Sequence, residues 1–329
     1  MPMTAFTALT RASGTTRKLS TSALSPLVSV NLFPSRRCNF ECKFCFHTAK
    51  SSIELSIANA RRGLRMLKEA GTEKVNIAGG EPFMRPRFLG QLVEACADLD
   101  LVVSIISNGS LIKHDWMRQH GQHISVLGVS CDSFDEATNA ACGRRSRAAS
   151  RRTDARQHAQ QFEHALRVRE WCDEASIKYK LNSVVNTLNW QEDMNAGVAR
   201  LDPFRWKVFQ CLLLEGENAG VDALRDAAPF VVSDEQFASF VHRHSALSPV
   251  VEANSEMRSS YVLIDEQMRF LNCADGRKVP TASILDVGVW AAFAEAGFDA
   301  DAFVRRGGVY DWARERPPAP ETHQAAYEY

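Results

Sequence analysis

Three cysteines lie close together near the start of the chain, at Cys38, Cys42 and Cys45. Cysteine thiolates ligate iron–sulfur clusters, and a cubane cluster normally takes four of them. Three ligands would leave one iron without a protein ligand, so that the cluster can bind a small molecule as well as transfer electrons. The spacing alone leaves an alternative open, because these cysteines and His47 also match a Cys3His zinc site.

A glycine-rich motif, GGEP at residues 79–82, follows the cysteines after one expected strand and helix. Glycines allow the backbone to approach another group closely, and Glu81 offers a carboxylate for an ammonium group. Taken alone, the motif predicts only a turn. Ser107, Asn108 and Ser130 stand at the ends of later expected strands, where each by itself would be interpreted as a turn or capping residue.

Stretches with strand character alternate with helical patterns, and these elements must position the motifs. We interpret the strands as continuous apolar runs, which are typical of strands buried on both faces. Ile57, Ala60, Leu64 and Leu67 recur at helical spacing, and Gly71 is a natural terminator. The predicted strands are 27–33, 75–78, 101–107, 124–130, 178–185 and 206–212, and the predicted helices are 56–70, 87–98, 111–120, 153–175, 191–200 and 234–244.

Six alternations of strand and helix predict an α/β fold with a parallel sheet. A closed barrel of this kind needs eight repeats, so we expect a partial, open (βα)6 barrel with its chemistry at the carboxyl ends of the strands. We divide the chain into a flexible basic tail (1–26), the partial barrel (27–245), a C-terminal lobe that closes over the active site (246–315) and a flexible tail (316–329).

Composition limits the classes of function. The formal net charge is zero, which gives no general reason to bind nucleic acid, and there is no apolar run long enough to span a membrane. An odd count of nine cysteines in a long chain favours metal ligation in a reducing compartment over disulfides. We expect a cytoplasmic protein, although the absence of acidic residues before Glu41 is also compatible with a mitochondrial transit peptide.

An arginine-rich stretch at residues 143–156 has the composition of a flexible surface loop. A nucleic-acid contact is the less favoured interpretation, because no aromatic residue is interspersed with the charges.

The spacing CxxxCxxC followed by a GGEP loop resembles the signature of the radical S-adenosylmethionine (SAM) superfamily. The resemblance implies a [4Fe–4S] cluster on the three cysteines, with SAM chelating the open iron. It also implies that the GGEP loop binds the methionine amino group of SAM, while later strand ends hold the rest. The SAM-binding residues implied in this way are Phe44, Gly79, Gly80, Glu81, Ser107, Asn108, Ser130 and Arg144.

Longer strings resemble the viperin family, and they span most of the chain. Among them are CNFECKFCFHTAK at 38–50 and RWKVFQCLLLEGEN at 205–218. The resemblance implies conversion of CTP to 3′-deoxy-3′,4′-didehydro-CTP, an antiviral chain terminator. A 5′-deoxyadenosyl radical from SAM would remove the ribose 4′ hydrogen, and the 3′-hydroxyl would leave as water with uptake of one electron and one proton.

A triphosphate substrate requires several cations, because it carries about four negative charges. Arg205 and Lys207 are two apart on an expected strand, so their side chains share a face. The resemblance assigns Tyr261 to the nucleotide site, where it either donates hydrogen or packs against ribose. The substrate-binding residues implied by the family pattern are Asn31, Lys74, Lys180, Asn182, Arg205, Lys207, Lys278 and Arg306.

Departures from the animal pattern leave several points open. Ala78 replaces a serine before GGEP, and Gln267 replaces an aromatic residue, so that UTP is an alternative to CTP. Tyr329 ends the chain where animal members have a tryptophan linked to cluster delivery. We expect a monomer that depends on an electron-donor reductase and iron–sulfur delivery machinery. The alternative functions are a non-catalytic iron–sulfur scaffold and a zinc-stabilised fold.

Overall fold

One open, curved sheet organises the protein. The computed structural model describes residues 25–145 and 159–314, and within them ten strands follow the order β10-β9-β8-β1-β2-β3-β4-β5-β6-β7. The order is linear, so the sheet does not close into a complete barrel, in agreement with the predicted partial barrel. The consecutive parallel strands are β1 (Ser29–Leu32), β2 (Lys74–Ile77), β3 (Val102–Ser107), β4 (Val126–Ser130), β5 (Lys178–Val185), β6 (Arg205–Gln210) and β7 (Val250–Glu252).

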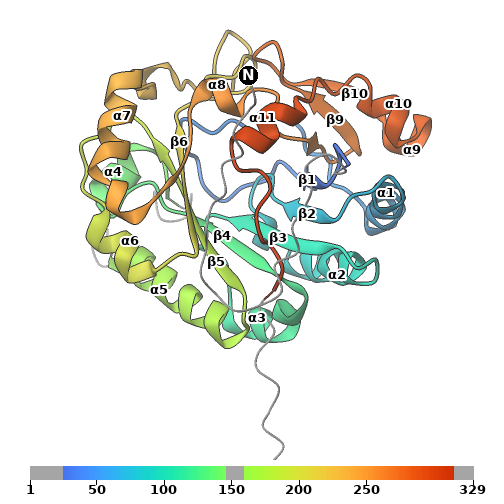
Figure 1. Ribbon diagram of the computed structural model, residues 1–329, viewed down its shortest axis with the longest axis horizontal. Helices are drawn as coiled ribbons and strands as arrows, with labels where there is room; N and C mark the ends of the chain where they lie inside the picture. The colour runs from blue at the N-terminus through green and yellow to red at the C-terminus, as the bar shows by residue number, and fades with distance from the viewer. Residues whose placement is uncertain (1–24, 146–158, 315–329) are drawn as a thin grey trace, which may run out of the picture.

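Helices follow the strands and cover the outside of the sheet (Figure 1). The first helix shows how the sequence sets its limits, because the Ser56 hydroxyl accepts a hydrogen bond from the Asn59 amide at 3.2 Å and Gly71 follows its end with a positive φ of 98°. These helices are α1 (Ile57–Glu69), α2 (Pro86–Ala97), α3 (His114–His120), α4 (Glu136–Ala141), α5 (Ala159–Glu174), α6 (Asn195–Leu201) and α7 (Asp234–Arg243).

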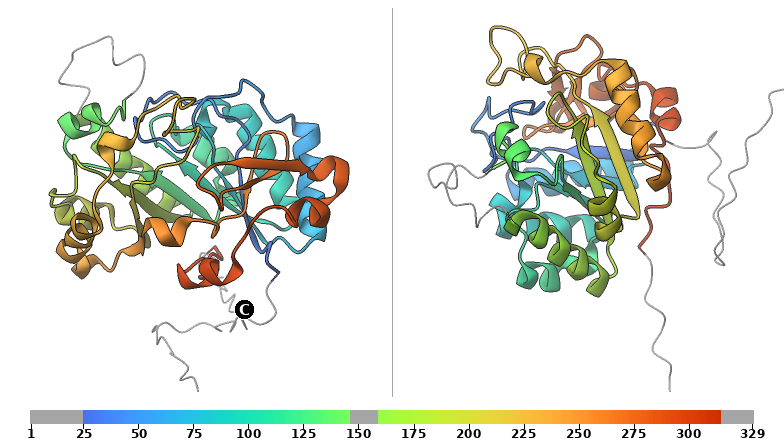
Figure 2. Two further views of the ribbon diagram at one scale, coloured as in Figure 1. Left: turned by 90° about the horizontal axis from the view of Figure 1, so that it is seen from above. Right: turned by 90° about the vertical axis from the view of Figure 1, so that its left-hand side faces the viewer.

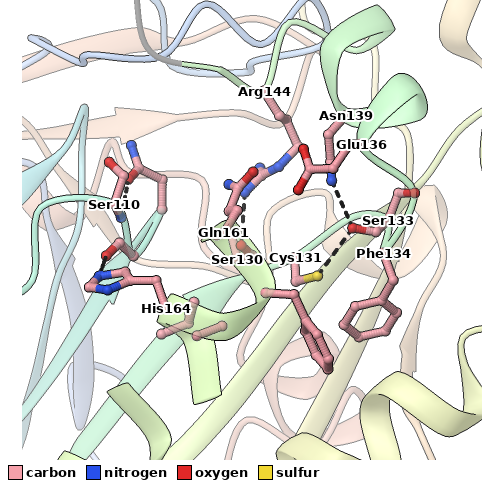
Figure 3. A pocket seen from close by; sticks show the side chains of 15 residues that line it. Ser110, Ser130, Cys131, Ser133, Phe134, Glu136, Asn139, Arg144, Gln161 and His164 are labelled. Carbon is pink, nitrogen blue, oxygen red and sulfur yellow. Dashed lines mark hydrogen bonds between the residues drawn. The ribbon is translucent and has the colours of Figure 1, made fainter. Parts of the chain in front are cut away.

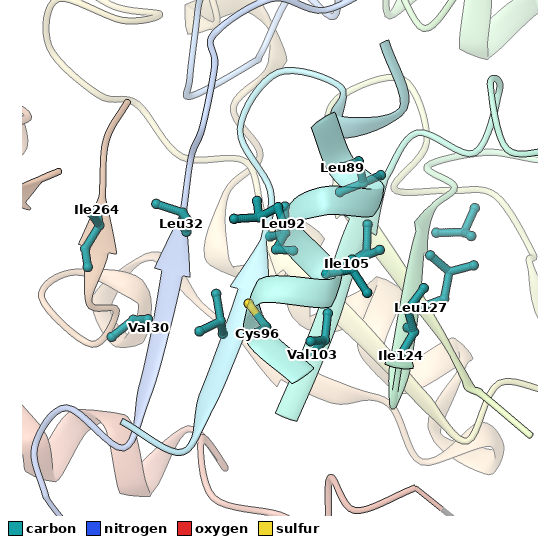
Figure 4. Packing of buried hydrophobic residues seen from close by; sticks show 14 of the residues in the cluster. Val30, Leu32, Leu89, Leu92, Cys96, Val103, Ile105, Ile124, Leu127 and Ile264 are labelled. Carbon is teal, nitrogen blue, oxygen red and sulfur yellow. The ribbon is translucent and has the colours of Figure 1, made fainter. Parts of the chain in front are cut away.

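The main hydrophobic core lies between the outer face of the sheet and these helices. Leu89, Leu92 and Cys96 of α2 pack among alternate residues of the strands beneath it, including Leu32 and Ile105 (Figure 4). All five side chains are almost fully buried. Burying one leucine or isoleucine side chain contributes about 1.5–3 kcal/mol, so this layer is a main source of stability.

The inner face of the sheet is polar, and here our interpretation of the strands as continuous apolar runs is wrong. Polar and apolar residues alternate in β1 (SVNL), β2 (KVNI) and β6 (RWKVFQ), yet β2 is buried at every position. Both faces are therefore buried as expected, but only one of them is hydrophobic. An alternating polar row inside a barrel indicates a ligand site, because buried polar groups need partners.

The C-terminal part of the chain extends the sheet and covers one end of it. β8 (Leu263–Ile264) pairs in parallel with β1, and β9 (Arg269–Asn272) and β10 (Val279–Ser283) continue antiparallel. The short helices α8 (Asn254–Met257), α9 (Ile284–Val287) and α10 (Val289–Phe293) precede α11 (Ala300–Arg305), which lies in front of the strands in Figure 1 and below them in the left view of Figure 2.

Contacts of α11 and the residues after it show which end of the barrel is covered. Phe303 and Trp312 pack against Val28 and Val126, which lie at the amino-terminal ends of β1 and β4. Lys178, the first residue of β5, lies 3.2 Å from the Asp311 carboxylate. The amino-terminal end is therefore closed by this segment, opposite the end that carries the cysteines.

All six predicted strands and six predicted helices are present, and their ends are shifted except for the strand at 178–185; the helix predicted at 153–175 is described only from Ala159. The sequence did not predict β7 to β10, of which β8 has only two residues. The predicted tails and most of the arginine-rich stretch 143–156 lie outside the described residues. The division into barrel and lobe stays a prediction, since β7 and β8 join both parts in one sheet.

Candidate active site

The cysteine loop runs from β1 towards α1 at the carboxyl end of the sheet. The Phe40 amide lies 3.4 Å from the Cys38 sulfur, and the Cys45 thiol contacts the His47 carbonyl oxygen at 3.4 Å. Burial raises the pKa of Cys38 to about 11, and burial also raises the pKa values of Cys42 and Cys45. Buried thiols of this kind become thiolates when a cationic metal group supplies the compensating charge.

These residues fit an iron–sulfur cluster better than a zinc ion. His47 is unsuited to complete a Cys3His zinc site, since its Nδ1 lies 2.9 Å from the Lys278 ammonium nitrogen. Without His47 the three cysteines are one ligand short of a tetrahedral zinc site, whereas three thiolates suffice for a cluster whose fourth iron takes a ligand from a small molecule.

The GGEP motif holds the cysteine loop through the backbone. Gly80 and Glu81 donate amide hydrogen bonds to the carbonyl oxygens of Ser35 and Arg37, at 2.9 and 2.7 Å. A Cβ atom on Gly80 would lie only 1.8 Å from the Arg37 oxygen, and Gly79 has a φ of 112°. The close approach expected from the two glycines is therefore made to the loop that carries the cysteines.

Glu81 connects this loop to the end of β3. Its buried carboxylate accepts hydrogen bonds from the Ser107 hydroxyl at 2.8 Å and from the Asn108 amide at 2.7 Å. Burial raises the pKa of Glu81, although these donors oppose the shift. The Asn108 side-chain amide lies 3.9 Å from the Cys38 sulfur. Three of the predicted residues, Glu81, Ser107 and Asn108, are thus brought together beside a predicted cluster ligand.

Arg144 reaches the end of β4 and borders a small cavity of about 40 Å³ (Figure 3). Its guanidinium donates to the Ser130 carbonyl oxygen at 2.8 Å and pairs with the buried Asp132 carboxylate at 2.9 Å. Phe44 is placed differently, because its ring lies 6.1 Å from that of Phe230 in a separate apolar cluster. Asp132, in the string SCDSFDE at 130–136, was not among the predicted residues.

Five predicted cations gather on the inner side of the barrel, and we call them the cation cluster. The register pairs Lys180 with Arg205 and Asn182 with Lys207 on the neighbouring strands β5 and β6. Lys74 begins β2 and donates to the Tyr310 hydroxyl at 2.8 Å. The members of the cation cluster are Lys74, Lys180, Arg205, Lys207 and Arg306.

Burial weakens the ionisation of the three lysines of the cation cluster. Burial, followed by the neighbouring positive charges, lowers the pKa values of Lys74 and Lys180. Burial also lowers the pKa of Lys207 to about 8, although Glu252 opposes this shift. Within the described ranges, Lys180 has no hydrogen bond or ion pair. Lys180 is 8% exposed, and a largely buried lysine without an ion-pair partner among the described residues indicates a place for an anion.

Polar groups without partners mark the same inner face. The Asn182 carboxamide oxygen and the Ser104 hydroxyl are buried, and neither has a hydrogen-bond partner among the described residues. Asn31 lies on β1 and uses its side-chain amide to reach the Val262 carbonyl oxygen at 3.1 Å. Sequence reasoning missed Ser104, because a serine within an apolar strand carries no motif.

Two further residues complete the centre of the cation cluster. The hydroxyl of Tyr261 contacts the carboxylate of Glu252, which is fully buried on β7 and also pairs with Lys207. The guanidinium of Arg306 lies 3.6 Å from the centre of the Tyr261 ring. Glu252 was missed because the strand VVE is too short to show a periodicity.

Lys278 is the predicted substrate cation that the structure does not place in this cluster. Its ammonium group donates to the Phe46 carbonyl oxygen at 2.6 Å and lies 3.5 Å from the Glu217 carboxylate. Glu217 also pairs with Arg36 at 2.8 Å and accepts a hydrogen bond from the Thr48 amide. This buried network anchors the end of the cysteine loop.

Comparisons with known proteins agree with this geometry. The model of the radical SAM superfamily matches residues 32–186. A solved structure described as native anSMEcpe with bound AdoMet and Kp18Cys peptide superposes with a TM-score of 0.61 over 84% of this chain and 83% of that chain. Its sequence is only 14% identical, so the likeness concerns the fold alone.

Relatives in sequence are closer. The protein named S-adenosylmethionine-dependent nucleotide dehydratase RSAD2 from Siniperca chuatsi is 49% identical over 298 residues, which cover 89% of this chain and 81% of the relative. A protein from Flammeovirga pacifica with the name S-adenosylmethionine-dependent nucleotide dehydratase is 32% identical, over 86% of this chain and 96% of the relative. The cofactors of this chain are accordingly a [4Fe–4S] cluster and SAM, and the chain belongs to the viperin-like family of S-adenosylmethionine-dependent nucleotide dehydratases within the radical SAM superfamily.

Proposed function

We propose that this protein is a radical SAM dehydratase that acts on a pyrimidine nucleoside triphosphate, CTP or UTP. The observation that carries the proposal is the cation cluster on the inner face of the same barrel whose carboxyl end bears the cysteines. The names of the relatives support a nucleotide substrate, and the buried ammonium of Lys180 supports a polyanionic one. A scaffold protein would have no need for such a group.

Cys38, Cys42 and Cys45 would hold the [4Fe–4S] cluster, and the neighbouring residues would hold SAM. When bound, these cofactors supply the carbon-centred radical that removes the ribose 4′ hydrogen. Glu81 and Arg144 would hold SAM, and the GGEP backbone would fix the cysteine loop in place. Gly79, Gly80, Ser107, Asn108 and Ser130 complete the proposed SAM site, to which Phe44 contributes apolar packing.

The positions of the residues along the strands orient the nucleotide. Lys74 and Arg205 are the first residues of β2 and β6, so the cation cluster lies towards the amino-terminal end of the sheet. The triphosphate would point to that end, and the ribose would lie between Asn31 and Asn182, facing the cysteines. This places the ribose carbon nearest to the radical source and keeps the phosphates away from it.

Tyr261 and Lys278 have different parts in this proposal. The Tyr261 hydroxyl is already bound to Glu252 and its ring lies beneath Arg306, which favours packing against the ribose over hydrogen donation. Lys278 contacts the cysteine loop and pairs with Glu217. It would reach the cluster or the substrate only after this ion pair breaks. The electrons would come from a separate reductase, and the cluster would be inserted by dedicated delivery machinery. The protein would act as a monomer in the cytoplasm.

The test is an anaerobic assay of reconstituted protein with dithionite and SAM, in which CTP, UTP, GTP and ATP are supplied separately. We expect one pyrimidine triphosphate to increase 5′-deoxyadenosine formation and to lose the mass of one water. Formation of 5′-deoxyadenosine that no nucleotide increases would contradict the substrate and leave the superfamily assignment intact.

A further inference from the structure

Glu252 is a buried carboxylate in the middle of a site built from cations. It ends β7, and its side chain has no exposure to solvent. A negative charge at this place repels the phosphates that the cation cluster would bind, so it costs affinity for the ligand. A carboxylate at the centre of an anion site therefore needs a physical reason.

The contacts of Glu252 provide that reason. One carboxylate oxygen pairs with Lys207 and lies 3.3 Å from a guanidinium nitrogen of Arg306, and the other accepts a hydrogen bond from the Tyr261 hydroxyl. Lys207 closes the arrangement by donating to the same hydroxyl at 3.0 Å. Three side chains from three separate segments are thus brought to one carboxylate before any ligand arrives, and Arg306 is held in addition by the Ser260 carbonyl oxygen at 2.8 Å.

The remaining cations do not depend on Glu252 in this way. Lys74 is held by Tyr310, Arg205 donates to the Gly307 carbonyl oxygen at 2.7 Å, and Lys180 has no ion-pair partner among the described residues. Removing the carboxylate should therefore disturb one half of the cation cluster and leave the other half in place.

Charge balance points in the same direction. When every member is ionised, the cation cluster and Glu252 together have an excess of four positive charges, which matches the charge of about four on a nucleoside triphosphate. Without the carboxylate, the cations would repel one another more strongly, and part of their charge would be lost by deprotonation.

We propose that Glu252 is the positioning residue of the triphosphate site, which fixes Lys207, Arg306 and Tyr261 and keeps Lys207 charged for the ligand. The inference rests on the proposed function, because it takes a nucleoside triphosphate as the ligand. It assigns to β7 a role that no motif in the sequence indicates.

The experiment compares the pH dependence of CTP and UTP binding between the wild type and Glu252→Gln, using cluster-reconstituted protein with SAM and no reductant. The groups that face Lys207 are Glu252, Arg306, Arg205, Lys180, Lys74 and Tyr261, and Glu252 is the anion among them. In the wild type, affinity should fall as the pH rises through about 8, where Lys207 loses its proton.

In Glu252→Gln the midpoint of this fall should move to lower pH by about one unit or more, because an opposite charge beside Lys207 is removed. At pH 8.5 the variant should bind about tenfold more weakly than the wild type. Glu252→Asp keeps the charge with a shorter reach, so its midpoint should lie between the two. Its behaviour also tests the inference if Glu252→Gln does not fold, which thermal unfolding and SAM binding report.

The matched control is Glu192→Gln, which removes a partly buried carboxylate that accepts a hydrogen bond from the Phe134 amide, away from the cation cluster. Its pH profile should follow the wild type. An unshifted midpoint in both Glu252 variants, with the wild type binding normally, would overturn the inference and leave the proposed function standing. Failure of the wild type to bind either nucleotide would instead contradict the proposed function, and the inference with it.

Discussion

Single residues decide how the proposed site responds to pH. Burial lowers the pKa of Lys207 to about 8, and burial together with neighbouring cations lowers those of Lys74 and Lys180. The charged form of each lysine binds an anion, so a bound triphosphate raises these pKa values again. Ligand binding should therefore be accompanied by proton uptake near neutral and mildly alkaline pH.

Calorimetry of nucleotide binding in buffers of different ionisation enthalpy measures that uptake directly. We expect a net gain of protons at pH 8, which decreases in Lys207→Met because the titrating group is absent. Affinity for the nucleotide should fall by about tenfold for each lysine ammonium group that is removed from the site. Proton release on binding would contradict the assignment of these lysines.

The predicted close contact at Gly80 gives a test of the cysteine loop. In Gly80→Ala the new methyl group would meet the Arg37 carbonyl oxygen, so the loop must shift. We expect loss of most of the iron and sulfide after reconstitution, while the fold stays intact at a cost of about 1–3 kcal/mol. Metal analysis and the visible absorption of the cluster provide the measurement.

Gly276→Ala is the control for this substitution. Gly276 has a positive φ of 72°, which Gly80 does not have, and no atom lies within 4 Å of the place of its Cβ. The control therefore adds a methyl group and backbone strain without any clash, and its iron content should equal that of the wild type. Equal loss of iron in both variants would show that the contact with Arg37 is not what disturbs the loop.

Strands and helices explain which parts of the fold can be derived from sequence. The six longer strands have enough residues to show a pattern, and α1 shows its hydrophobic spacing and its cap. β7 and β8 have three and two residues, and they exist because the rest of the sheet offers an edge to pair with. Glu252 was missed for that reason, while Lys207 was found through the family string around it.

Sequence motifs identified the three cysteines and the GGEP loop, but they did not predict the contacts between the two segments. The hydrogen bonds of Gly80 and Glu81 to the cysteine loop join segments that are far apart in sequence, and no local pattern describes such a pair. The same holds for Asp132 and Glu217, because their roles follow only from the ion pairs with Arg144 and Lys278.

The hydrophobic core between the sheet and the helices is the region where truncation of a side chain should destabilise the protein most. Leu92 is fully buried between α2 and the sheet, so Leu92→Ala should destabilise the protein by about 2–5 kcal/mol. Leu224→Ala, at a side chain that is 48% exposed, should change stability by less than about 0.5 kcal/mol. Chemical denaturation measures both, and similar losses in the two variants would contradict the packing described for α2.

At the scale of the whole protein, the two ends of the barrel have different roles. The carboxyl end carries the cysteines, whereas α11 and the residues that follow it close the amino-terminal end near the cation cluster. Within the described residues, no helix is long and apolar enough to cross a lipid bilayer.

This arrangement predicts that damage to the closed end affects one ligand selectively. Trp312→Ala should loosen the segment that places Tyr310 and Gly307 against Lys74 and Arg205. We expect nucleotide affinity to fall by about tenfold or more while SAM affinity changes by less than about twofold. Equilibrium dialysis with each ligand makes the comparison, and parallel loss of both affinities would show general unfolding instead.

The alternation of polar and apolar residues along the strands separates two kinds of change during evolution. In β5, Leu181 faces the helices, while Lys180 and Asn182 face the interior. Substitutions on the inner rows can alter which ligand is preferred with little effect on the layer that folds the chain. Substitutions on the outer rows can repack the core and leave the ligand chemistry unchanged. Relatives can therefore diverge in substrate while they keep one scaffold.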